Sequence, residues 1–478
     1  MTTTPTARRM SAAVAAPVAA AALATAPRWL PPAVIRLREW IFTAVNGTEG
    51  VAVPGPLVGP EHFERVYGHP AAEGRSAGAG LSDLFWYWLS PGPHMHQEHL
   101  EPGEDYRTVS RTTRSVLAVP HRRADELATA ATARALRGLS PDRSSRVHLR
   151  DLMMPVWAEV FYELVFDEPC PPRARALVVG NADDVVRALK ATSVRHMDRR
   201  HRLTRYLLGR LRDGTCPVRL PEPFTDQETA WYLQGAFFNT AVVQMSEAMA
   251  HVLMCAAAAP DSRDRATDDD ALDRLIDETL RVFPLFGIAH RITTAPIEVD
   301  ESTTLPTGSV LLFNYLAYQR TGPASDDAFD PERWRTLPRS EAHFIPYGVK
   351  ANRACPARGV APVMLRAATR EVLRTHAVTS TAAHTRSLPS GGPAYLTPDG
   401  ACPPSPGRLQ AMRAADRWAD TGRSLTQLAF GTWMVLDARR QRLSTRHFAG
   451  RDRSGGRPAT TEDRTPAAPE PAAARSGR

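Results

Sequence analysis

The stretch Phe344–Gly359 reads "FIPYGVKANRACPARG" and places Cys355 directly before a proline and two residues after Arg353. Cysteine is scarce in this chain of 478 residues, which has only five: Cys170, Cys216, Cys255, Cys355 and Cys402. None of them forms a CxxC pair, which argues against a disulfide-stapled secreted protein and against a structural zinc site. The chemistry of Cys355 therefore has to come from its surroundings.

Those surroundings favour a thiolate. Cys355 follows a turn-rich segment that contains Gly348, and it precedes a helix predicted from about Pro362. The entrance of a helix carries partial positive charge, and nearby basic side chains add to it. These basic residues are Lys350, Arg353 and Arg358. A thiolate here could be a nucleophile or a ligand of a metal or haem. Taken alone, the cysteine fits an inert buried thiol at least as well.

Two distant motifs change this balance. In "ETLR", Glu278 and Arg281 are spaced as i and i+3 on a predicted helix, and "FDPERW" supplies Arg333. The first motif alone is weak, because ion pairs at this spacing are common on helix surfaces. The ordered set is specific: ExxR, then Arg291 on a predicted strand, then FxPxRW, then a loop that ends at Cys355.

With these motifs in this order, the chain resembles the cytochrome P-450 superfamily, the haem-thiolate monooxygenases, over roughly residues 30–398. The resemblance implies haem b as cofactor, with Cys355 as the axial thiolate ligand of its iron. Such a ligand donates electron density that favours O–O cleavage. It implies that Glu278, Arg281 and Arg333 form a buried triad, here called the Glu278 triad. It also implies that Arg291 and Arg353 pair with the haem propionates, as arginine suits carboxylates.

The cysteine loop departs from the family pattern. It is one residue longer than usual between Gly348 and Cys355, and Ala357 stands where the family has glycine. Loop glycines let the backbone approach a porphyrin and donate N–H groups to the sulfur, so we expect altered hydrogen bonding there. In "GEDYRTVSR", Tyr106 stands where the family has histidine. Tyr106 and Arg107 are expected near a propionate, with a solvated basic helix face as the alternative.

The longest predicted helix begins at "TDQE", where Thr225 and Glu228 are spaced as a capping box, and it ends near Pro260. It is apolar nearly all round, which is typical of a helix through the middle of a domain. The resemblance implies that Asn239 and Thr240 replace the acid–alcohol pair that delivers protons. Asparagine cannot titrate. Water could relay the protons, peroxide could be the oxidant, or the haem could act without O2. A plain interior Asn–Thr pair is the other reading.

A histidine-rich stretch, "HMHQEH", contains His94, His96 and His99. It lies in a segment rich in Gly and Pro, so we expect simple loop polarity. Contacts with substrate or haem edge are the first alternative, and metal binding is the second.

The predicted fold class is mainly α with a smaller β portion, as in the P-450 fold. Four parts are expected along the chain: a flexible Ala-rich leader (1–28), the haem-thiolate catalytic domain (29–398), a helical extension (399–447) and a disordered basic tail (448–478). An amphipathic helix is predicted from Pro31. The extension is expected to pack back onto the body, with self-association or a docked partner as the alternative.

The net charge of +8 does not indicate nucleic-acid binding, because residues 399–478 hold 14 arginines against eight acidic residues and the body is close to neutral. No stretch reaches the ~20 strongly apolar residues of a transmembrane anchor. Together with the resemblance, which implies oxidation of a small-molecule substrate, this leads us to expect a cytoplasmic enzyme acting on an apolar or mid-sized metabolite of secondary metabolism.

Electrons are expected from an acidic ferredoxin and its reductase, docked near Lys350, Arg353 and Arg358; peroxide is the other oxidant source. Two other classes stay open. One is a haem-thiolate enzyme that uses peroxide or no O2, such as a peroxygenase, hydroperoxide isomerase or dehydratase. The other is a catalytically silent haem-binding protein.

Overall fold

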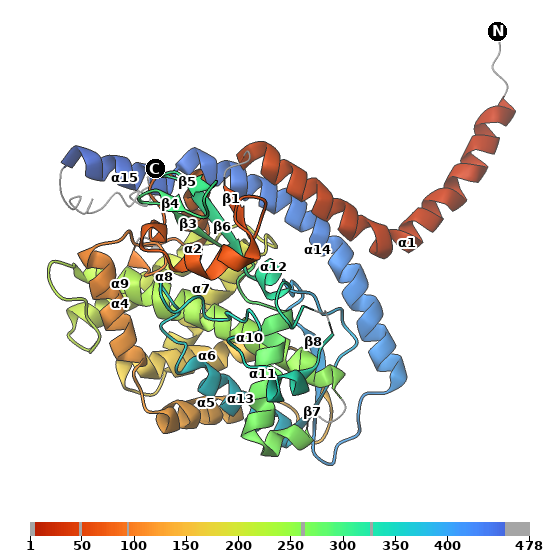
Figure 1. Cartoon of the computed structure of the whole chain (residues 1–478). Coiled ribbons are helices and arrows are strands. Elements are labelled where there is room, and N and C mark those ends of the chain that lie inside the picture. The colour runs from red at the N-terminus through yellow and green to blue at the C-terminus, as the bar shows by residue number, and fades with distance from the viewer. Residues whose placement is uncertain (1–4, 47–49, 93–94, 260–262, 326–327, 455–478) are drawn as a thin grey trace, which may run out of the picture.

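The computed structural model describes residues 5–46, 50–92, 95–259, 263–325 and 328–454 (Figure 1). It confirms a mainly helical fold with small sheets. The helices are α1 (Pro5–Asn46), α2 (Phe63–Gly68), α3 (Gly80–Leu89), α4 (Glu104–Leu117), α5 (His121–Leu136), α6 (Leu149–Phe166), α7 (Pro172–Leu189), α8 (Met197–Arg212), α9 (Asp226–Leu233), α10 (Val242–Ala258), α11 (Asp269–Val282), α12 (Tyr315–Gln319), α13 (Ala361–Thr375), α14 (Pro406–Gln441) and α15 (Leu443–Ser454).

The strands form three small sheets in the described part of the chain, ordered β1–β6–β3, β2–β8–β7 and β4–β5. Their bounds are β1 (Val51–Val53), β2 (Ser145–His148), β3 (Ile288–Ile292), β4 (Ile297–Glu298), β5 (Thr304–Leu305), β6 (Val310–Asn314), β7 (His376–Thr379) and β8 (Pro393–Pro398). The parallel pairing of β1 with β6 joins segments about 260 residues apart, with Val51 opposite Leu311. This sheet positions Arg291, which lies on β3 opposite Leu311.

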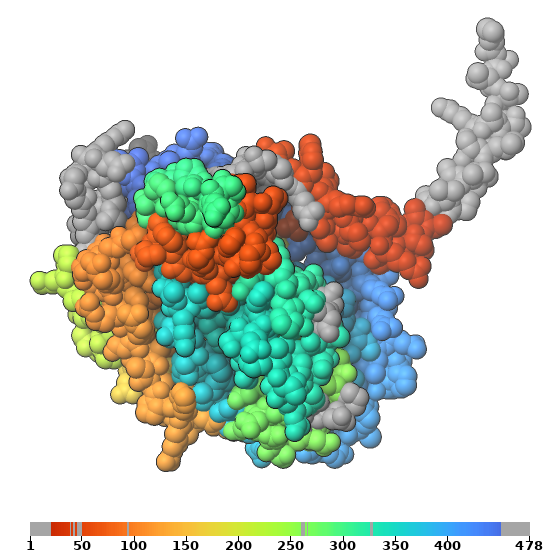
Figure 2. All heavy atoms as spheres, in the orientation of Figure 1, coloured from red at the N-terminus to blue at the C-terminus, as the bar shows by residue number. Residues whose placement is uncertain are grey.

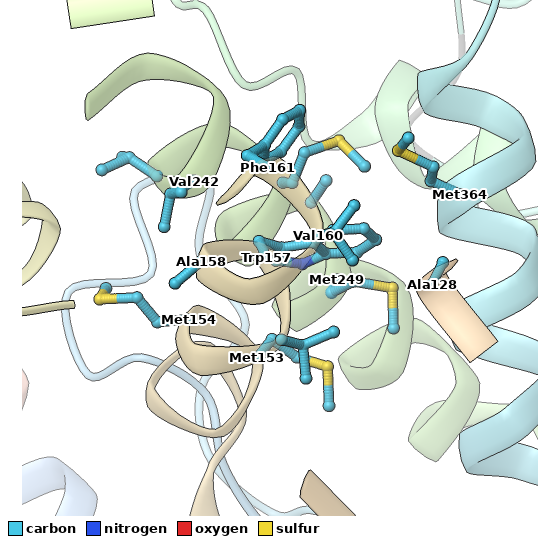
Figure 3. Close-up of a cluster of buried hydrophobic side chains, with 14 of the residues drawn as sticks. Ala128, Met153, Met154, Trp157, Ala158, Val160, Phe161, Val242, Met249 and Met364 are labelled. Atoms are coloured by element: carbon cyan, nitrogen blue, oxygen red, sulfur yellow. The ribbon is translucent and has the colours of Figure 1, made fainter. Parts of the chain in front are cut away.

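The main core surrounds α6. Figure 3 shows Trp157 of α6 among side chains from three other helices, including Met249 of α10, Ala128 of α5 and Met364 of α13. Trp157 has no exposed surface. The close packing of these apolar side chains fixes the relative positions of α5, α6, α10 and α13, and so the frame in which the cysteine loop before α13 lies.

The long predicted helix is present as α9 and α10. Its capping box is confirmed, because Thr225 Oγ1 accepts from the Glu228 amide and Glu228 Oε2 accepts from the Thr225 amide. The segment Gln234–Ala241 between the two helices is π-helical, which the sequence did not predict. Contrary to the expectation from the sequence, residues 226–258 are long and apolar enough to cross a membrane, but 78% of the most apolar window is buried within the protein. This is therefore a core helix.

Two long helices from opposite parts of the sequence lie together. α1 and α14 run side by side along one edge of the body, and the blue C-terminal segment borders the red α1 in the space-filling view (Figures 1 and 2). The helix expected from Pro31 begins earlier, at Pro5, so the described part of the expected leader belongs to α1. The helical extension was expected to pack back onto the body. It does so through α14, which packs Met434, Val435 and Ala438 against α3 and α7. Within the expected tail, α15 continues to Ser454, and residues 455–478 lie outside the described residues.

Candidate active site

The cysteine loop closes on itself before α13. The Cys355 amide donates to the Tyr347 carbonyl at 2.9 Å. Gly348 lies between them with φ +74°, and a Cβ there would come within 3.1 Å of Tyr67 Oη, so both the backbone angle and the space require glycine. The Arg358 amide donates to the Cys355 carbonyl at 3.2 Å. The amides of Ala357 and Arg358 lower the pKa of the Cys355 thiol, so alanine in place of the loop glycine leaves backbone N–H groups beside the sulfur.

The expected thiolate is not stabilised by the protein alone. Burial raises the pKa of the Cys355 thiol to about 11, although the neighbouring amides and Arg358 act in the opposite direction. Helix α13 begins only at Ala361, and solvent screens the charges of Lys350 and Arg358, whose side chains are both exposed. The sequence predicted a lowered pKa for the Cys355 thiol, and this prediction was wrong because desolvation outweighs the nearby charges. A cation bound to the sulfur would lower this pKa and favour the thiolate.

Three guanidinium groups are buried near the loop. Arg75, Arg291 and Arg353 are only 5%, 1% and 8% exposed. Glu98 is the one carboxylate within salt-bridge distance of them among the described residues, at 2.8 Å from Arg75 Nη2. Burial alone would raise the pKa of the Glu98 carboxyl, but Arg75 and Arg291 outweigh it and hold the pKa below its ordinary value. Two of the three buried positive charges are left without a partner carboxylate.

The unpaired atoms can be named. Arg291 Nε and Nη1, and Arg353 Nε and Nη2, are buried without a hydrogen-bond partner. Buried charged donors of this kind are costly unless something accepts from them. Two carboxylates of a ligand would supply both the missing charge and the missing acceptors. We refer below to Arg75, Glu98, Arg291 and Arg353 as the arginine cluster.

Contacts from distant segments hold this cluster in place. Arg353 Nη1 donates to the carbonyls of Gln97 and Leu100 at 3.2 and 2.8 Å, and its guanidinium lies 4.0 Å from the centre of the Tyr106 ring. Arg291 Nη2 donates to Tyr67 Oη at 2.9 Å. The structure thus brings together the expected site residues Gly348, Arg291, Arg353, Cys355 and Tyr106.

Two expectations about basic residues are corrected. Arg107 does not join the cluster, because it lies at the surface and pairs with Glu104 at 2.9 Å. Arg353 cannot belong to a ferredoxin-docking patch, because it is buried. Lys350 and Arg358 remain as exposed cations near the cysteine loop.

The Glu278 triad forms as expected. Glu278 Oε1 accepts from Arg281 at 2.7 Å and from Arg333 at 3.1 Å, and Glu278 has no exposed surface. Two further donors complete the site: Trp334 Nε1 at 3.0 Å and the Asp330 amide at 2.9 Å. Trp334 lies in the quoted "FDPERW" motif, but the sequence analysis gave it no role. The triad joins α11 to the 3-10 turn Pro331–Arg335.

Comparison with solved structures identifies this architecture. A 6-coordinated cytochrome P450 from Thermus thermophilus matches with a TM-score of 0.55 and 18% identity, over 70% of this chain and 91% of that one. A mutant of cytochrome P450SP alpha (CYP152B1) matches with a TM-score of 0.58 and 16% identity, over 70% and 89%. A variant of cytochrome P450 OleT in complex with arachidonic acid matches with a TM-score of 0.54 and 15% identity, over 67% and 83%.

The chain has the cytochrome P450 fold. No protein-family model and no curated protein matches its sequence, so the likeness is one of fold.

Within this P450 fold, one apolar cluster joins the cysteine loop to the long helix. It includes Tyr347 and Ala357 of the loop, Val243 and Met245 of α10, and Tyr106 of α4. The loop and α10 therefore belong to the same core, and Tyr106 links that core to the arginine cluster.

The π-helical segment of the P450 fold places Asn239 and Thr240 differently. Asn239 is 1% exposed, and both ends of its amide are bonded: Asn181 on α7 donates to Oδ1, and Nδ2 donates to the Leu89 carbonyl at 3.3 Å. Thr240 is partly exposed, and its hydroxyl has no hydrogen bond among the described residues. Asn239 thus belongs to an interior hydrogen-bond network, while the Thr240 hydroxyl remains available for a hydrogen bond.

The histidine-rich stretch is not simple loop polarity. His96 and His99 are 7% and 4% exposed and lie beside the arginine cluster, while His94 is outside the described residues. Burial lowers the pKa of His96 to about 4, and burial together with Arg75 lowers the pKa of His290 to about 3. No group of three His, Cys, Asp or Glu residues suited to a metal ion occurs in the described ranges.

Arg75, Glu98 and His290 were missed by the sequence analysis. Arg75 lies in a loop and His290 beside Arg291 on a strand, and neither position belongs to a repeating pattern. Of these three residues, only Glu98 lies in a motif that the sequence makes conspicuous, the histidine-rich stretch "HMHQEH".

Proposed function

We propose that this chain is a member of the cytochrome P-450 superfamily, a haem-thiolate oxidoreductase that oxidises an apolar or mid-sized metabolite. The arginine cluster carries this proposal. Haem b has two propionate groups, and the buried arginines Arg291 and Arg353 lack two carboxylate partners in the described part of the chain. Cys355 lies on the same loop as Arg353, and the neighbouring amides of Ala357 and Arg358 favour the charged form of its sulfur.

The residues fit this cofactor in named roles. Cys355 would hold the haem iron through its sulfur, Arg291 and Arg353 would hold the propionates, and Tyr106 would keep the Arg353 guanidinium in place by stacking. Bound haem would supply the oxidative chemistry, with the thiolate tuning the iron. Amide donors from Ala357 and Arg358 would disperse charge on the sulfur and so raise the reduction potential.

Two oxidants fit this proposal. The main proposal is monooxygenase chemistry with electrons from a ferredoxin and its reductase. A second candidate is peroxide-dependent oxidation, favoured because Asn239 is held by Asn181 and Leu89 and because the π-helical segment contains no carboxylate. One structure of similar fold binds arachidonic acid, an apolar chain with a carboxylate. This supports an apolar substrate for the present chain.

The first experiment is the spectrum of the purified chain, reduced with dithionite and exposed to carbon monoxide. We expect a strongly red-shifted Soret band in the wild type, lost in Cys355→Ser and retained in Cys402→Ser, a matched change at an exposed cysteine. A haem-free protein, or the same band in both variants, would refute the proposal. With haem established, turnover with peroxide alone is compared with turnover with ferredoxin and reductase.

A further inference from the structure

Exposed large apolar side chains gather on two helices. Of the thirteen such residues whose side chains the structure describes, nine lie on α1 and α14. They are Leu23, Trp29, Ile35, Leu37, Trp40, Trp418, Leu425, Trp433 and Leu436. The four tryptophans among them are 48–67% exposed. Exposed tryptophan is unfavourable in water, and a concentration of it on one part of a surface marks an interaction site.

On α14 these residues form a stripe. Trp418, Leu425 and Leu436 are separated by seven and eleven residues, which is about two and three helical turns, so they share one face. The opposite face is buried against the body through Met434 and Ala438. The stripe therefore points away from the catalytic body.

On α1, Trp29 and Trp40 are separated by eleven residues and share a face in the same way. The two helices run parallel: the segment around Arg28 and Arg36 lies beside Asp420, and Arg38 Nη1 donates to Gln427 Oε1 at 3.3 Å (Figure 1). Trp29 and Trp418 thus fall toward one end of the pair, and Trp40 and Trp433 toward the other.

The charge of the chain is also concentrated in these regions. Residues 1–46 carry five arginines and one glutamate, a net of +4, and residues 399–478 carry +6, so the total of +8 leaves residues 47–398 with −2. A surface groove of about 540 Å³ lies between the two helices. Its lining includes Arg28 and Arg36, which make no ion pair among the described side chains, together with one carboxylate, Asp420.

We propose that α1 and α14 together form a docking surface for an anionic lipid bilayer. Tryptophan and leucine would enter the headgroup region, and the arginines would contact lipid phosphates. A bilayer fits better than a second copy of the chain, because two copies would bring like charges together. It fits better than a nucleic acid, because nucleic acid does not bury a stripe of tryptophan and leucine along a helix. The enzyme would then act as a peripheral membrane protein.

The test uses the full chain and vesicles of phosphatidylcholine, with and without phosphatidylglycerol. Sedimentation should show binding at least about tenfold tighter to the anionic vesicles, weakened by salt. Tryptophan emission should shift to the blue on binding. Trp418→Ser with Trp433→Ser should weaken binding by about tenfold or more. Arg28→Gln with Arg36→Gln should reduce the preference for phosphatidylglycerol.

The matched control is Leu57→Ser with Ile288→Ser, two exposed apolar residues on the body, which should bind as the wild type does. Circular dichroism verifies that each variant is folded. Equal binding to both kinds of vesicle, or no effect of the tryptophan changes, would overturn the proposal. Light scattering that shows a dimer, lost in the tryptophan variant without any lipid binding, would overturn it in favour of a second copy.

Discussion

The side-chain amide of Asn181 on α7 donates to the side-chain carbonyl of Asn239 in the π-helical segment. The contact belongs to a buried series of hydrogen bonds. Thr204 donates to Gln234 Oε1 at 2.6 Å, Gln234 donates to Asn181 Oδ1 at 2.8 Å, and Asn239 donates to the Leu89 carbonyl. These hydrogen bonds connect α7, α8 and the end of α3 to the long helix. Asn239 thus has a structural task, whatever it contributes to catalysis.

Replacing Asn239 by leucine should destabilise the protein. The change leaves the Leu89 carbonyl without its donor, and leaves the Asn181 amide with only the Phe238 carbonyl, at 3.3 Å, as acceptor. An unmet buried polar group of this kind costs about 1–3 kcal/mol. Urea unfolding measures this free energy. The neighbouring Thr240→Val variant is the control, because its hydroxyl has no partner among the described residues, and its stability should change little. If instead Asn239→Leu is fully stable but loses turnover, the residue acts in catalysis alone.

Breaking the Glu278 triad should be more costly. Glu278→Gln removes a buried charge that faces Arg281 and Arg333, and one uncompensated buried cation costs about 3–5 kcal/mol. Because that variant could fail to fold, Trp334→Phe provides a milder test. It removes a single 3.0 Å bond to Glu278 and should cost about 1–3 kcal/mol in thermal or urea unfolding. A neutral Trp334→Phe would show that the bond contributes nothing measurable.

Arg291→Met should have opposite effects on the haem-free and the haem-loaded protein. Without haem, the change removes a buried guanidinium with two unpartnered nitrogens, so the free energy of unfolding should stay level or rise by about 1 kcal/mol. With haem, it removes a propionate partner, and transfer of haem to a scavenger protein should be about tenfold faster or more. The exposed Arg107→Met is the control and should change neither quantity. Unaltered haem transfer in Arg291→Met would contradict the assignment.

The buried histidines should make the protein sensitive to mild acid. The folded pKa values of His96 and His290 are lowered to about 4 and about 3, mainly by burial, with Arg75 adding to the effect and Glu98 opposing it. In the unfolded chain both titrate near 6.5. Below that pH the unfolded state therefore binds more protons, and the free energy of unfolding falls as pH drops from about 6.5 to about 4, by about 1.4 kcal/mol per pH unit for each histidine.

Melting temperature measured across this pH range tests the slope. His96→Gln with His290→Gln should reduce the slope, because glutamine does not titrate. Part of the slope should remain, because burial also lowers the pKa values of His99, His251 and His384. An equally steep slope in the variant would show that groups other than His96 and His290 cause the acid sensitivity. The stacking of His290 on Phe85, at 4.9 Å between ring centres, is a neutral contact that the variant also loses, so the comparison is made on slopes and not on absolute stability.

The sequence by itself determined the parts that depend on local pattern. The Thr225–Glu228 capping box, the apolar helix that follows it, the strand that carries Arg291 and the helix after Cys355 are all where their residues predict them. These features follow from helical period and capping chemistry, which act within a few residues. The Glu278 triad was expected only from the resemblance to the cytochrome P-450 superfamily, because no local rule pairs Glu278 with Arg333, 55 positions away.

Only the tertiary structure decided which charges are buried together. Arg75, Glu98, Arg291 and Arg353 are separated by up to 278 positions, and no local rule relates them. The pKa of Cys355 was misjudged for the same reason: the nearby cations are visible in the sequence, but desolvation is a property of the packed interior. The pairing of α1 with α14 likewise joins helices about 390 positions apart, as the contact of Arg38 with Gln427 shows. Burial and long-range contact depend on the whole fold, and so they cannot be read from spacing.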